Sequence, residues 1–529
     1  MTKTISACQL HAMLTDGREI ALIDVREEGV FAKRHILRAV PAPLSRLEAR
    51  IDTLVPRRSC RMVLCDADDG LAARAAARLA GFGYTHVAVL DGGVEAWRAA
   101  GYELYSGVNV PSKAFGEFVE QRYGTPRIAA RDLEARRAAG ENVVVLDSRP
   151  FAEYRKMSIP GGIDCPGAEL VLRVHDAVPS PETTVVVNCA GRTRSIIGAQ
   201  SLINAGVANP VLALENGTMG WHLAGLALDR GQERRAPEVS AAGLDKARAA
   251  AARVARRFGV PTIDRDALAA FERQSESRSL FVLDVRGPDE YAAGHMAGSR
   301  NAPGGQLVQA TDHYVGTLGA RLVLVDDSGV RATMTASWLV QMGWREVYVL
   351  EGGLAGDLVT GAEAPNVLGL EEAESVSAHE LAALIESGEA VVVDLATSLE
   401  YRDGHVPGAW FAVRSRFAVS LPKLPGAGRF VLTSPDGLMA DLASPDAQAV
   451  LDRPVRVLAG GTAAWRAAGF ALETGQTNMA DAADDVWYRP YDKDASVEAA
   501  MQAYLTWEVG LVEQIARDET IAFEYFPAE

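Results

Sequence analysis

Cysteine is scarce in this chain of 529 residues, which holds only five cysteines scattered along its length. Scattered thiols do not make a disulfide framework, and none of these forms a CxxC pair or a cluster with histidine that would bind zinc. We therefore expect no metal site, and a reducing cytoplasm is the simplest setting for the chain. The five are Cys8, Cys60, Cys65, Cys165 and Cys189.

The sequence also lacks long apolar runs and an excess of positive charge. No run approaches the ~18 apolar residues that cross a bilayer, and the first residues lack the apolar stretch of a signal peptide. The net charge of −16 argues against a broad nucleic-acid surface and against anionic membranes. No GxGxxG or Walker A motif follows a predicted strand, so no organic cofactor is implied. We expect neither nucleic acid nor a membrane as a partner, and any anion site must be built locally.

What the sequence does contain is one unit repeated four times. Each copy opens with a short strand, a helix that begins after Ser or Asp, a polar turn and an apolar strand that ends at an aspartate. Each copy closes with a strand and a glycine-containing turn, followed in three copies by a helix with a tryptophan; Asp357 takes that place in the third copy. The aspartates are Asp24, Asp147, Asp284 and Asp394, and the tryptophans are Trp97, Trp221 and Trp465.

Strands that alternate with helices over about a hundred residues predict α/β domains, each with a mainly parallel sheet covered by helices on both faces. A copy of this length buries a core of its own, so we expect four tandem domains rather than turns of a solenoid. Helical linkers are expected before the second and third domains, and a C-terminal helical tail is expected to pack back through Tyr504, Trp507 and Leu511. The predicted domains are residues 1–108, 109–235, 236–362 and 363–475, followed by the tail at 476–529.

One loop stands out for its chemistry, in the stretch "TVVVNCAGRTRSIIGAQ" at residues 184–200. A valine strand runs into Cys189, a polar loop follows, and an apolar helical stretch begins at Ile196. Open α/β sheets bind ligands at the carboxyl ends of their strands, and the N–H groups at a helix start favour anions and thiolates. Arg192 and Arg194 add positive charge. The sequence therefore predicts Cys189 to be a nucleophile with a low pKa.

These features together resemble the rhodanese family of the thiosulfate sulfurtransferase superfamily over about residues 1–475. The resemblance rests on the Asp-x-Arg strand ends, on "GHMAGS" and "GHVPGA" after them, on the cysteine loop and on the Gly-Gly…Trp endings. It implies a sulfurtransferase without a cofactor, in which the loop cysteine takes the outer sulfur of an anionic donor such as thiosulfate. The cysteine would hold it as a persulfide until an acceptor, cyanide or a thiol, removes it. The oligomeric state is left open.

Residue by residue, only the second unit fits the family's site. The resemblance implies that Cys189 carries the persulfide and that Arg194 meets the anionic donor. Arg149 is either a second donor contact or half of a structural pair with a carboxylate such as Glu153. The cradle of N–H groups would be formed by Ala190, Gly191, Arg192, Thr193, Arg194 and Ser195.

The other three loops look idle by the same comparison. Unit one keeps Cys65 but follows it with carboxylates that should raise its pKa, so it is either inert or a relay thiol. Unit three has Asp326 in place of the cysteine and keeps Arg331, and unit four has Thr433 and Ser434 and no arginine. Ser158 stands where the other units have His35, His295 and His405, which we interpret as the loss of a turn contact. The carboxylates of unit one are Asp66, Asp68 and Asp69.

Two other functions fit part of the pattern. A cysteine phosphatase or arsenate reductase uses a similar thiolate, but with an arginine six residues after the cysteine; here Arg194 is five residues after Cys189 and residue 195 is serine. A shorter loop suits a single sulfur better than a tetrahedral phosphate. The other alternative is a multi-domain scaffold or sulfur-sensing protein, in which the degenerate units serve binding.

Overall fold

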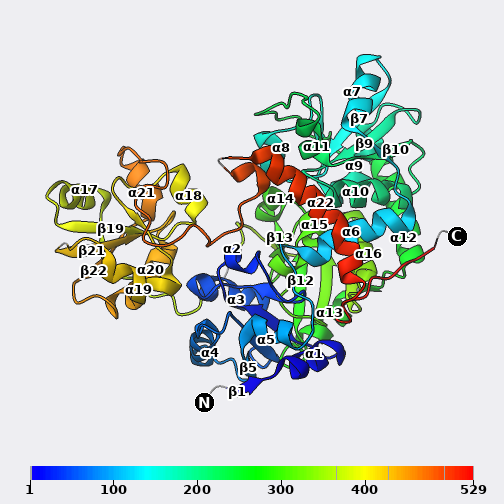
Figure 1. Cartoon of the computed structure of the whole chain (residues 1–529). Coiled ribbons are helices and arrows are strands. Elements are labelled where there is room, and N and C mark those ends of the chain that lie inside the picture. Colours follow the sequence, from blue (N-terminus) through cyan, green and yellow to red (C-terminus); the bar gives the residue numbers. More distant parts are fainter. Residues whose placement is uncertain (1–2, 365, 427, 494, 528–529) are drawn as a thin grey trace.

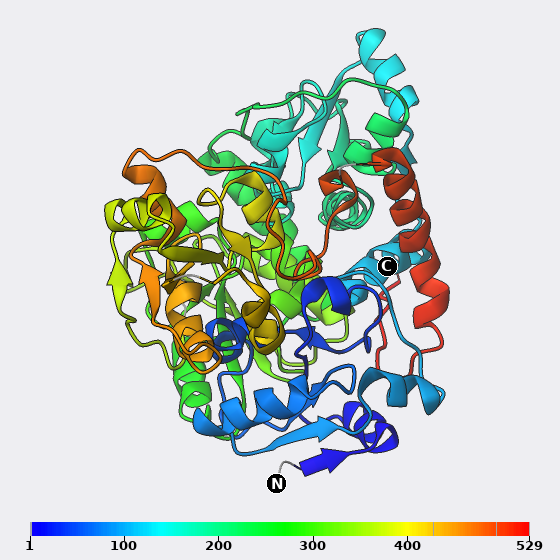
Figure 2. The same cartoon turned by 60° about the vertical axis from the view of Figure 1, so that its left-hand side comes forward.

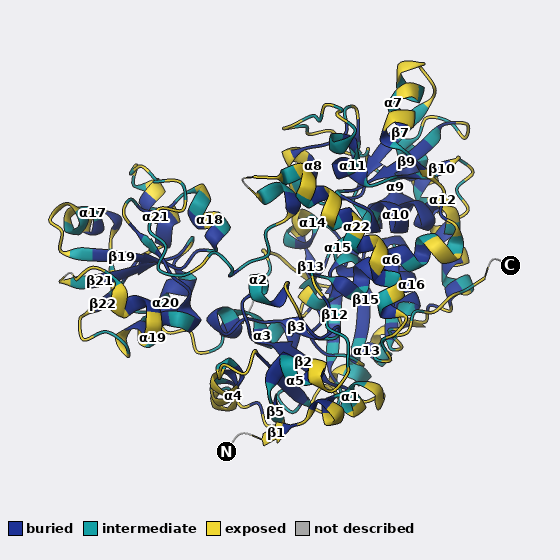
Figure 3. Cartoon of the chain, viewed as in Figure 1, coloured by how far each residue is buried: buried dark blue, intermediate teal, exposed yellow. Residues whose placement is uncertain are grey.

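The computed structural model describes residues 3–364, 366–426, 428–493 and 495–527. These residues form four α/β units, each built around a five-stranded sheet, and the fourth unit lies to the left of the others in Figure 1. The strands of each of these sheets run parallel, so the connecting helices lie on both faces. Figure 3 shows the result, with buried strands between helices whose outer faces are exposed. The predicted fold class is confirmed.

The first unit has the strand order β1-β5-β4-β2-β3, in which the first strand lies at one edge beside the last. Its strands are β1 (Lys3–Ile5), β2 (Ala21–Asp24), β3 (Val40–Pro41), β4 (Met62–Cys65) and β5 (Val87–Leu90). Its helices are α1 (Ala7–Thr15), α2 (Glu28–Phe31), α3 (Leu47–Leu54), α4 (Leu71–Gly81) and α5 (Gly93–Ala99). The serine cap predicted for the first helix is present in α1, where the Ser6 side chain accepts a hydrogen bond from Gln9 N.

The second unit repeats this order as β6-β10-β9-β7-β8. Its strands are β6 (Arg127–Ile128), β7 (Val143–Asp147), β8 (Ile163–Asp164), β9 (Thr184–Asn188) and β10 (Val211–Leu214). Its helices are α7 (Ala130–Ala138), α8 (Phe151–Lys156), α9 (Leu170–Ala177), α10 (Thr193–Asn204) and α11 (Gly217–Leu223). The expected Ser or Asp cap is missing at α7, which begins after Ala129 without a side-chain cap.

The third unit has the order β11-β16-β15-β12-β14 but ends differently. Its sheet holds β11 (Thr262–Ile263), β12 (Leu280–Asp284), β14 (Arg300–Asn301), β15 (Arg321–Val325) and β16 (Val347–Leu350). Its helices are α13 (Arg265–Glu272), α14 (Pro288–Ala293), α15 (Gly304–Gln309) and α16 (Val330–Gln341). Where Asp357 replaces the repeated tryptophan, the chain forms β17 (Leu358–Val359), which pairs antiparallel with β13 (His295–Met296) in place of the closing helix.

The fourth unit returns to the common pattern, with the order β18-β22-β21-β19-β20. Its strands are β18 (Ser375–Val376), β19 (Ala390–Asp394), β20 (Trp410–Phe411), β21 (Arg429–Thr433) and β22 (Val455–Leu458). Its helices are α17 (Ala378–Glu386), α18 (Ser398–Asp403), α19 (Phe417–Ser420), α20 (Leu438–Gln448) and α21 (Gly461–Ala467).

Three helices lie outside the units: the linkers α6 (Val110–Tyr123) and α12 (Ala241–Phe258), and the tail helix α22 (Val497–Ile515). One hydrophobic core runs from the second unit through α12 into the third, so these two units are packed as a pair. The tail helix α22 lies along α6, as Figures 1 and 2 both show, with Leu511 fully buried. The predicted helical tail is therefore confirmed. Within the described ranges, no helix is long and apolar enough to cross a membrane.

Candidate active site

The cysteine loop of the second unit begins where β9 ends. Asn188, the last residue of β9, lies opposite Asp147 of β7, and its side-chain amide donates to the Asp147 carboxylate at 2.8 Å. Cys189 follows and is only 2% exposed, and α10 begins four residues later at Thr193. Gly217 closes the loop from the other side, because its left-handed backbone and missing Cβ let α11 approach the Cys189 carbonyl, which accepts from Thr218 N at 2.8 Å. The loop is thus held at the carboxyl edge of the sheet.

The pKa of Cys189 differs from the sequence-based expectation. Burial raises the pKa of the Cys189 thiol above its ordinary value, and Glu508 of the tail adds to the rise. Arg194 and Ser195 act in the opposite direction, and the Ser195 hydroxyl lies 3.5 Å from the sulfur. The predicted low pKa is therefore wrong for this arrangement, because desolvation under the covering tail outweighs the cation and the helix start.

Two of the three predicted cations are held in ion pairs away from the sulfur. Arg149 is fully buried and forms two hydrogen bonds with Asp147, at 2.8 and 2.7 Å. This geometry favours the structural alternative for Arg149, with Asp147 rather than Glu153 as its partner. Arg192 is turned toward the linker helix α6, where it pairs with Glu117 at 2.6 and 2.7 Å and also with Glu120. Neither guanidinium points to the space beside Cys189.

Arg194 is the predicted cation that faces a cavity. Its guanidinium donates hydrogen bonds to the Glu153 carboxylate of α8 at 3.0 and 2.8 Å and to the Gln306 side chain of α15 at 3.1 Å. Burial alone would raise the pKa of Glu153, but Arg194 lowers it to about 2, so this carboxylate is ionised at neutral pH. Arg194 therefore belongs to the second unit and touches the third.

The cavity beside the loop has a volume of about 210 Å³ and is built from several parts of the chain. The second unit contributes Ala190 and Arg194, and the third contributes His313. The rest of the wall comes from the linker α6 and the tail, which supply Lys113, Trp487, Arg489, Tyr491 and Tyr504. The sequence left open whether the site is shared between domains. The walls of this cavity come from the second and third units, the linker and the tail.

A buried polar cluster of the linker and tail lies against the loop and was missed by sequence reasoning. Lys113 donates a hydrogen bond to the Tyr504 hydroxyl, which donates to Glu508 at 2.8 Å. The Thr193 hydroxyl also donates to Glu508, at 3.4 Å. A Cβ on Gly191 would lie 3.2 Å from the second Glu508 oxygen, so the carboxylate rests on the loop two residues after Cys189. No sequence signal marks this contact, since Thr193 and Glu508 are 315 residues apart.

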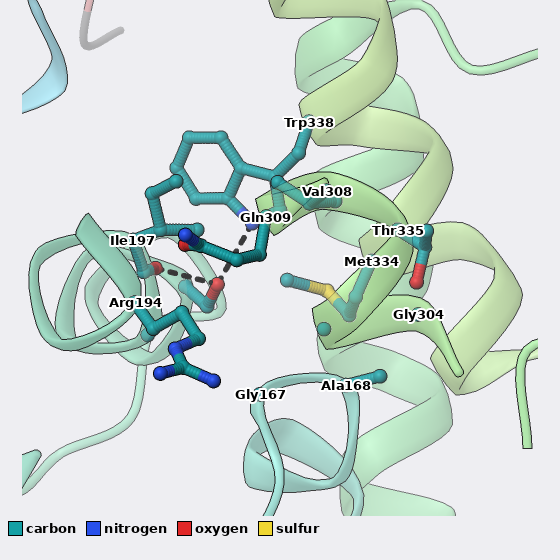
Figure 4. A pocket seen from close by; sticks show the side chains of 13 residues that line it. Gly167, Ala168, Arg194, Ile197, Gly304, Val308, Gln309, Met334, Thr335 and Trp338 are labelled. Carbon is teal, nitrogen blue, oxygen red and sulfur yellow. Dashed lines mark hydrogen bonds between the residues drawn. The ribbon is translucent and has the colours of Figure 1, made fainter. Parts of the chain in front are cut away.

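A second pocket, of about 30 Å³, lies on the other side of Arg194 between the second and third units. Figure 4 shows it between Ile197 and Arg194 of α10 on one side and Met334 and Thr335 of α16 on the other. Trp338 closes it and donates to the Ser201 hydroxyl at 2.8 Å. Its apolar walls suit packing between the units, and it offers Arg194 as the only charged lining group among the described residues.

The register of the sheets corrects the comparison of the four loops. Asp24 pairs with Cys65 as Asp147 pairs with Asn188, so Cys65 is the last strand residue and Asp66 takes the place of Cys189. Burial, together with Asp24 and Asp66, raises the pKa of the Cys65 thiol well above its ordinary value, as expected. By the same register, Asp326 and Ser434 take the place of Cys189 in the third and fourth units.

In the other three units, the side chain at the position of Cys189 accepts hydrogen bonds from backbone N–H groups of its own loop. The Asp66 carboxylate accepts from the backbone N–H groups of Asp68 and Ala72, both at 2.9 Å. Asp326 accepts from Gly329 and Arg331 at 2.6 and 3.0 Å, and Ser434 accepts from Ala440 N at 3.3 Å. A carboxylate or hydroxyl of the loop thus accepts hydrogen bonds from the loop's own N–H groups, whereas in the second unit the Ser195 amide contacts the Cys189 sulfur.

The histidines at the position of Ser158 share one local contact. The Nδ1 atoms of His35, His295 and His405 each lie within 3.2 Å of the carbonyl four residues earlier, and their rings stack on Phe31, Tyr291 and Tyr401. Ser158 is buried and its hydroxyl has no hydrogen-bond partner in the described structure. The substitution removes a turn contact, as interpreted from the sequence.

Fold and site together define a class: tandem parallel α/β units with one cysteine on a short loop between a strand end and a helix start. The Rhodanese-like domain family matches this chain four times, at residues 6–100, 129–224, 267–357 and 377–468. The chain belongs to the rhodanese-like family.

Individual proteins resemble all or part of the chain. A crystal structure of a thiosulfate sulfurtransferase from Pseudomonas aeruginosa has 48% sequence identity and a TM-score of 0.95, over 99% of this chain and 100% of that one. The thiosulfate sulfurtransferase GlpE of Pseudomonas paraeruginosa is 35% identical over 81 residues, which are 15% of this chain and 72% of GlpE. An HTH-type transcriptional regulator of Mycobacterium tuberculosis is 34% identical over 110 residues, which cover 20% of this chain and 47% of the regulator.

Proposed function

We propose that this protein is a sulfurtransferase that moves a sulfane sulfur from an anionic donor such as thiosulfate to cyanide or a thiol through a persulfide on Cys189. The similarity to thiosulfate sulfurtransferases over the whole chain and over a single domain supports sulfurtransferase activity in general. The donor, the acceptor and the persulfide are the parts that need experiments.

The observation that carries the proposal is the difference between the second loop and the other three. Cys189 is the only thiol at the loop position in the four units, and the residue after it, Ala190, lines a cavity whose charged groups are three cations and one carboxylate: Lys113, Arg194, Arg489 and Glu153. In the other units Asp66, Asp326 and Ser434 occupy that position and accept the loop's own hydrogen bonds. A cation-lined cavity beside one unfilled cradle supports an anionic donor at one site per chain.

The donor half-reaction balances without a cofactor. The Cys189 thiol gives up its proton as its sulfur attacks the outer sulfur of thiosulfate, and a sulfur–sulfur bond forms. The bond between that sulfur and the sulfonate sulfur breaks, and sulfite leaves with the electron pair and takes up the proton. The positively charged cavity stabilises the dianion as it enters and the sulfite as it forms.

Intact mass spectrometry after thiosulfate treatment tests the proposal. The wild-type chain should gain the mass of one sulfur atom, on the peptide that contains Cys189. Cys189→Ser should abolish both the mass gain and sulfur transfer, while Cys65→Ser, which changes a buried thiol at the equivalent sheet edge, should keep most activity. A sulfur on the Cys65 peptide with none on Cys189 would refute the assignment.

A further inference from the structure

Of the buried cluster of Lys113, Tyr504 and Glu508, only the charge of Lys113 is used in the donor half-reaction described above. Glu508 is 2% exposed, and one of its carboxylate oxygens has no hydrogen-bond partner among the described residues. An unpaired carboxylate oxygen in such a place costs free energy unless something donates a proton to it. The carboxylate lies against Gly191, two residues after Cys189, so whatever donates to it would lie beside the cysteine loop.

Tyr504 connects this carboxylate with the cavity. Its side chain lines the cavity wall beside Lys113, and its hydroxyl donates to Glu508 at 2.8 Å. The Lys113 ammonium lies 4.4 to 5.3 Å from three aromatic rings, those of Trp487, Tyr504 and Trp507. Its positive charge is therefore held at the cavity by cation–π contacts, where it would stabilise an anion that forms there.

We propose, building on the function proposed above, that Tyr504 and Glu508 accept the proton of a thiol acceptor as it attacks the persulfide, while Lys113 stabilises the thiolate. A thiol enters the cavity with its S–H group toward the Tyr504 hydroxyl. The hydroxyl takes that proton and passes its own to Glu508. The tail helix thus makes the site selective for acceptors that must lose a proton.

The acceptor half-reaction balances in atoms and electrons. A bond forms between the acceptor sulfur and the outer sulfur of the persulfide, and the bond between the outer sulfur and the Cys189 sulfur breaks. The electron pair stays on the Cys189 sulfur, and the sulfur that moves keeps its oxidation state. Burial raises the pKa of the Cys189 thiol, so the thiolate left behind takes a proton from Glu508 and the site returns to its starting state.

The test compares two acceptors on one preloaded enzyme. The full chain is loaded with thiosulfate, freed of donor, and mixed at mildly alkaline pH with glutathione or with sulfite, which attacks as an anion without a proton to lose and gives thiosulfate. Tyr504→Phe keeps the ring and its packing but removes the hydroxyl, and Glu508→Gln removes the charge. Each should slow discharge to glutathione by about 100-fold, with discharge to sulfite near the wild-type rate. Glu513→Gln, on the exposed side of the same helix, is the matched control.

The outcomes separate this inference from the function on which it rests. Equal losses with both acceptors would mean that the cluster only holds the loop in place, and no loss with either would mean that the thiol is deprotonated in solution; both refute the inference and leave the sulfurtransferase intact. A wild-type chain that takes up no sulfur would refute the proposed function itself. Selective loss with glutathione in Tyr504→Phe supports the inference even if Glu508→Gln disturbs the helix.

Discussion

At the scale of single residues, repetition within the chain separates structural groups from functional ones. Arg26, Arg149 and Arg286 each bind the aspartate two residues earlier and a carbonyl eight residues later, in three units of which one has the loop cysteine. Because the same arrangement recurs in units without the loop cysteine, it belongs to the fold. Arg149 therefore holds the strand end at Asp147, and its guanidinium is taken up by this buried pair.

Comparing the repeated units gives a less simple result for Arg194. Arg331, at the matching place in the third unit, pairs with Glu290 as Arg194 pairs with Glu153. The third unit has no loop cysteine, so this pair too is partly a device of the fold. What distinguishes Arg194 is that it lines the cavity beside Cys189, whereas Arg331 is bound to Glu169 of the second unit at 2.6 Å.

We predict that Arg194→Ala weakens the use of thiosulfate. Losing a charge-assisted contact of about 1.5–3 kcal/mol corresponds to roughly 10- to 150-fold in kcat/KM for the loading step. Discharge of preformed persulfide to cyanide should suffer less, because the donor has already left. Stopped-flow measurement of the two half-reactions separately checks this. Arg194→Lys should recover only part of the loss, since an ammonium lacks the planar fork.

The control for this prediction is Glu153. Arg194→Ala leaves a buried carboxylate without its partner, which could harm the site by itself. Glu153→Gln in the same chain removes that charge, so the double variant isolates the loss of the donor contact. Loading by the double variant at the wild-type rate would show that Arg194 acts only as the partner of Glu153.

Residue types and spacing were enough to single out Cys189 as the candidate nucleophile and to show that three loops differ from its loop, because strand ends and loop sequences are local features. They were not enough to foresee the pKa of Cys189, which is raised mainly by burial and further by a carboxylate from the tail. They also placed Cys65 one position too far along, because sequence alone does not show that Asp24 pairs with Cys65. The partners of Arg192 were missed for the same reason, since Glu117 belongs to a linker helix 75 residues away.

At the scale of elements, the tail helix α22 is the part that turns a rhodanese-like loop into an enclosed site. Its existence could be predicted from its sequence, and so could its buried aromatic side. Its docking depends on close approach to the segment before α6. Gly107 has a φ of +87°, and a Cβ there would overlap the ring of Trp507. The Trp507 ring of α22 can therefore pack at Gly107 because this residue has no side chain.

We predict that Gly107→Ala displaces α22 and uncovers Cys189. Gly101→Ala is the matched control, because Gly101 has a φ of +91° and nothing within 4 Å of its Cβ position. Both changes cost about 1–2 kcal/mol of backbone strain, but only the first overlaps the tail. The rate of Cys189 alkylation by iodoacetamide, followed by peptide mass spectrometry, should rise several-fold in Gly107→Ala and little in Gly101→Ala. Equal rates in the two variants would mean that α22 does not cover the thiol.

At the scale of the whole molecule, the units are joined in pairs by buried charges. Arg331 joins the third unit to Glu169 of the second, and Arg414 joins the fourth to Glu48 of the first at 2.9 and 3.1 Å. The four units themselves could be read from the sequence because each repeats one pattern. Their pairing could not, because residues such as Glu48 and Arg414 are 366 positions apart and neither carries a local sign of its partner.

The junction of the first and fourth units also contains a carboxyl group whose ionisation should set its stability. Glu27 is buried there and accepts hydrogen bonds from Ser45 of its own unit and Ser415 of the fourth, both at 2.8 Å. Burial raises the pKa of Glu27 from 4.5 to about 7, although the two serines act in the opposite direction. A folded-state pKa above the unfolded value means that the folded chain binds the proton more tightly. The stabilisation from this proton is complete below about pH 4.5 and is lost as the pH rises through about 7.

We predict that Glu27→Gln makes this junction less sensitive to pH. At pH 8 the wild-type chain must ionise a buried carboxyl, at a cost on the order of 3 kcal/mol, whereas the neutral amide avoids it. The melting temperature of Glu27→Gln relative to wild type should therefore be higher at pH 8 than at pH 5, as measured by calorimetry across this range. Asp394, whose pKa burial also raises to about 7, remains in both proteins, so the difference between them isolates Glu27. A difference that stays constant with pH would show that Glu27 is already ionised in the folded protein at pH 5, and that its two serine hydrogen bonds outweigh its burial.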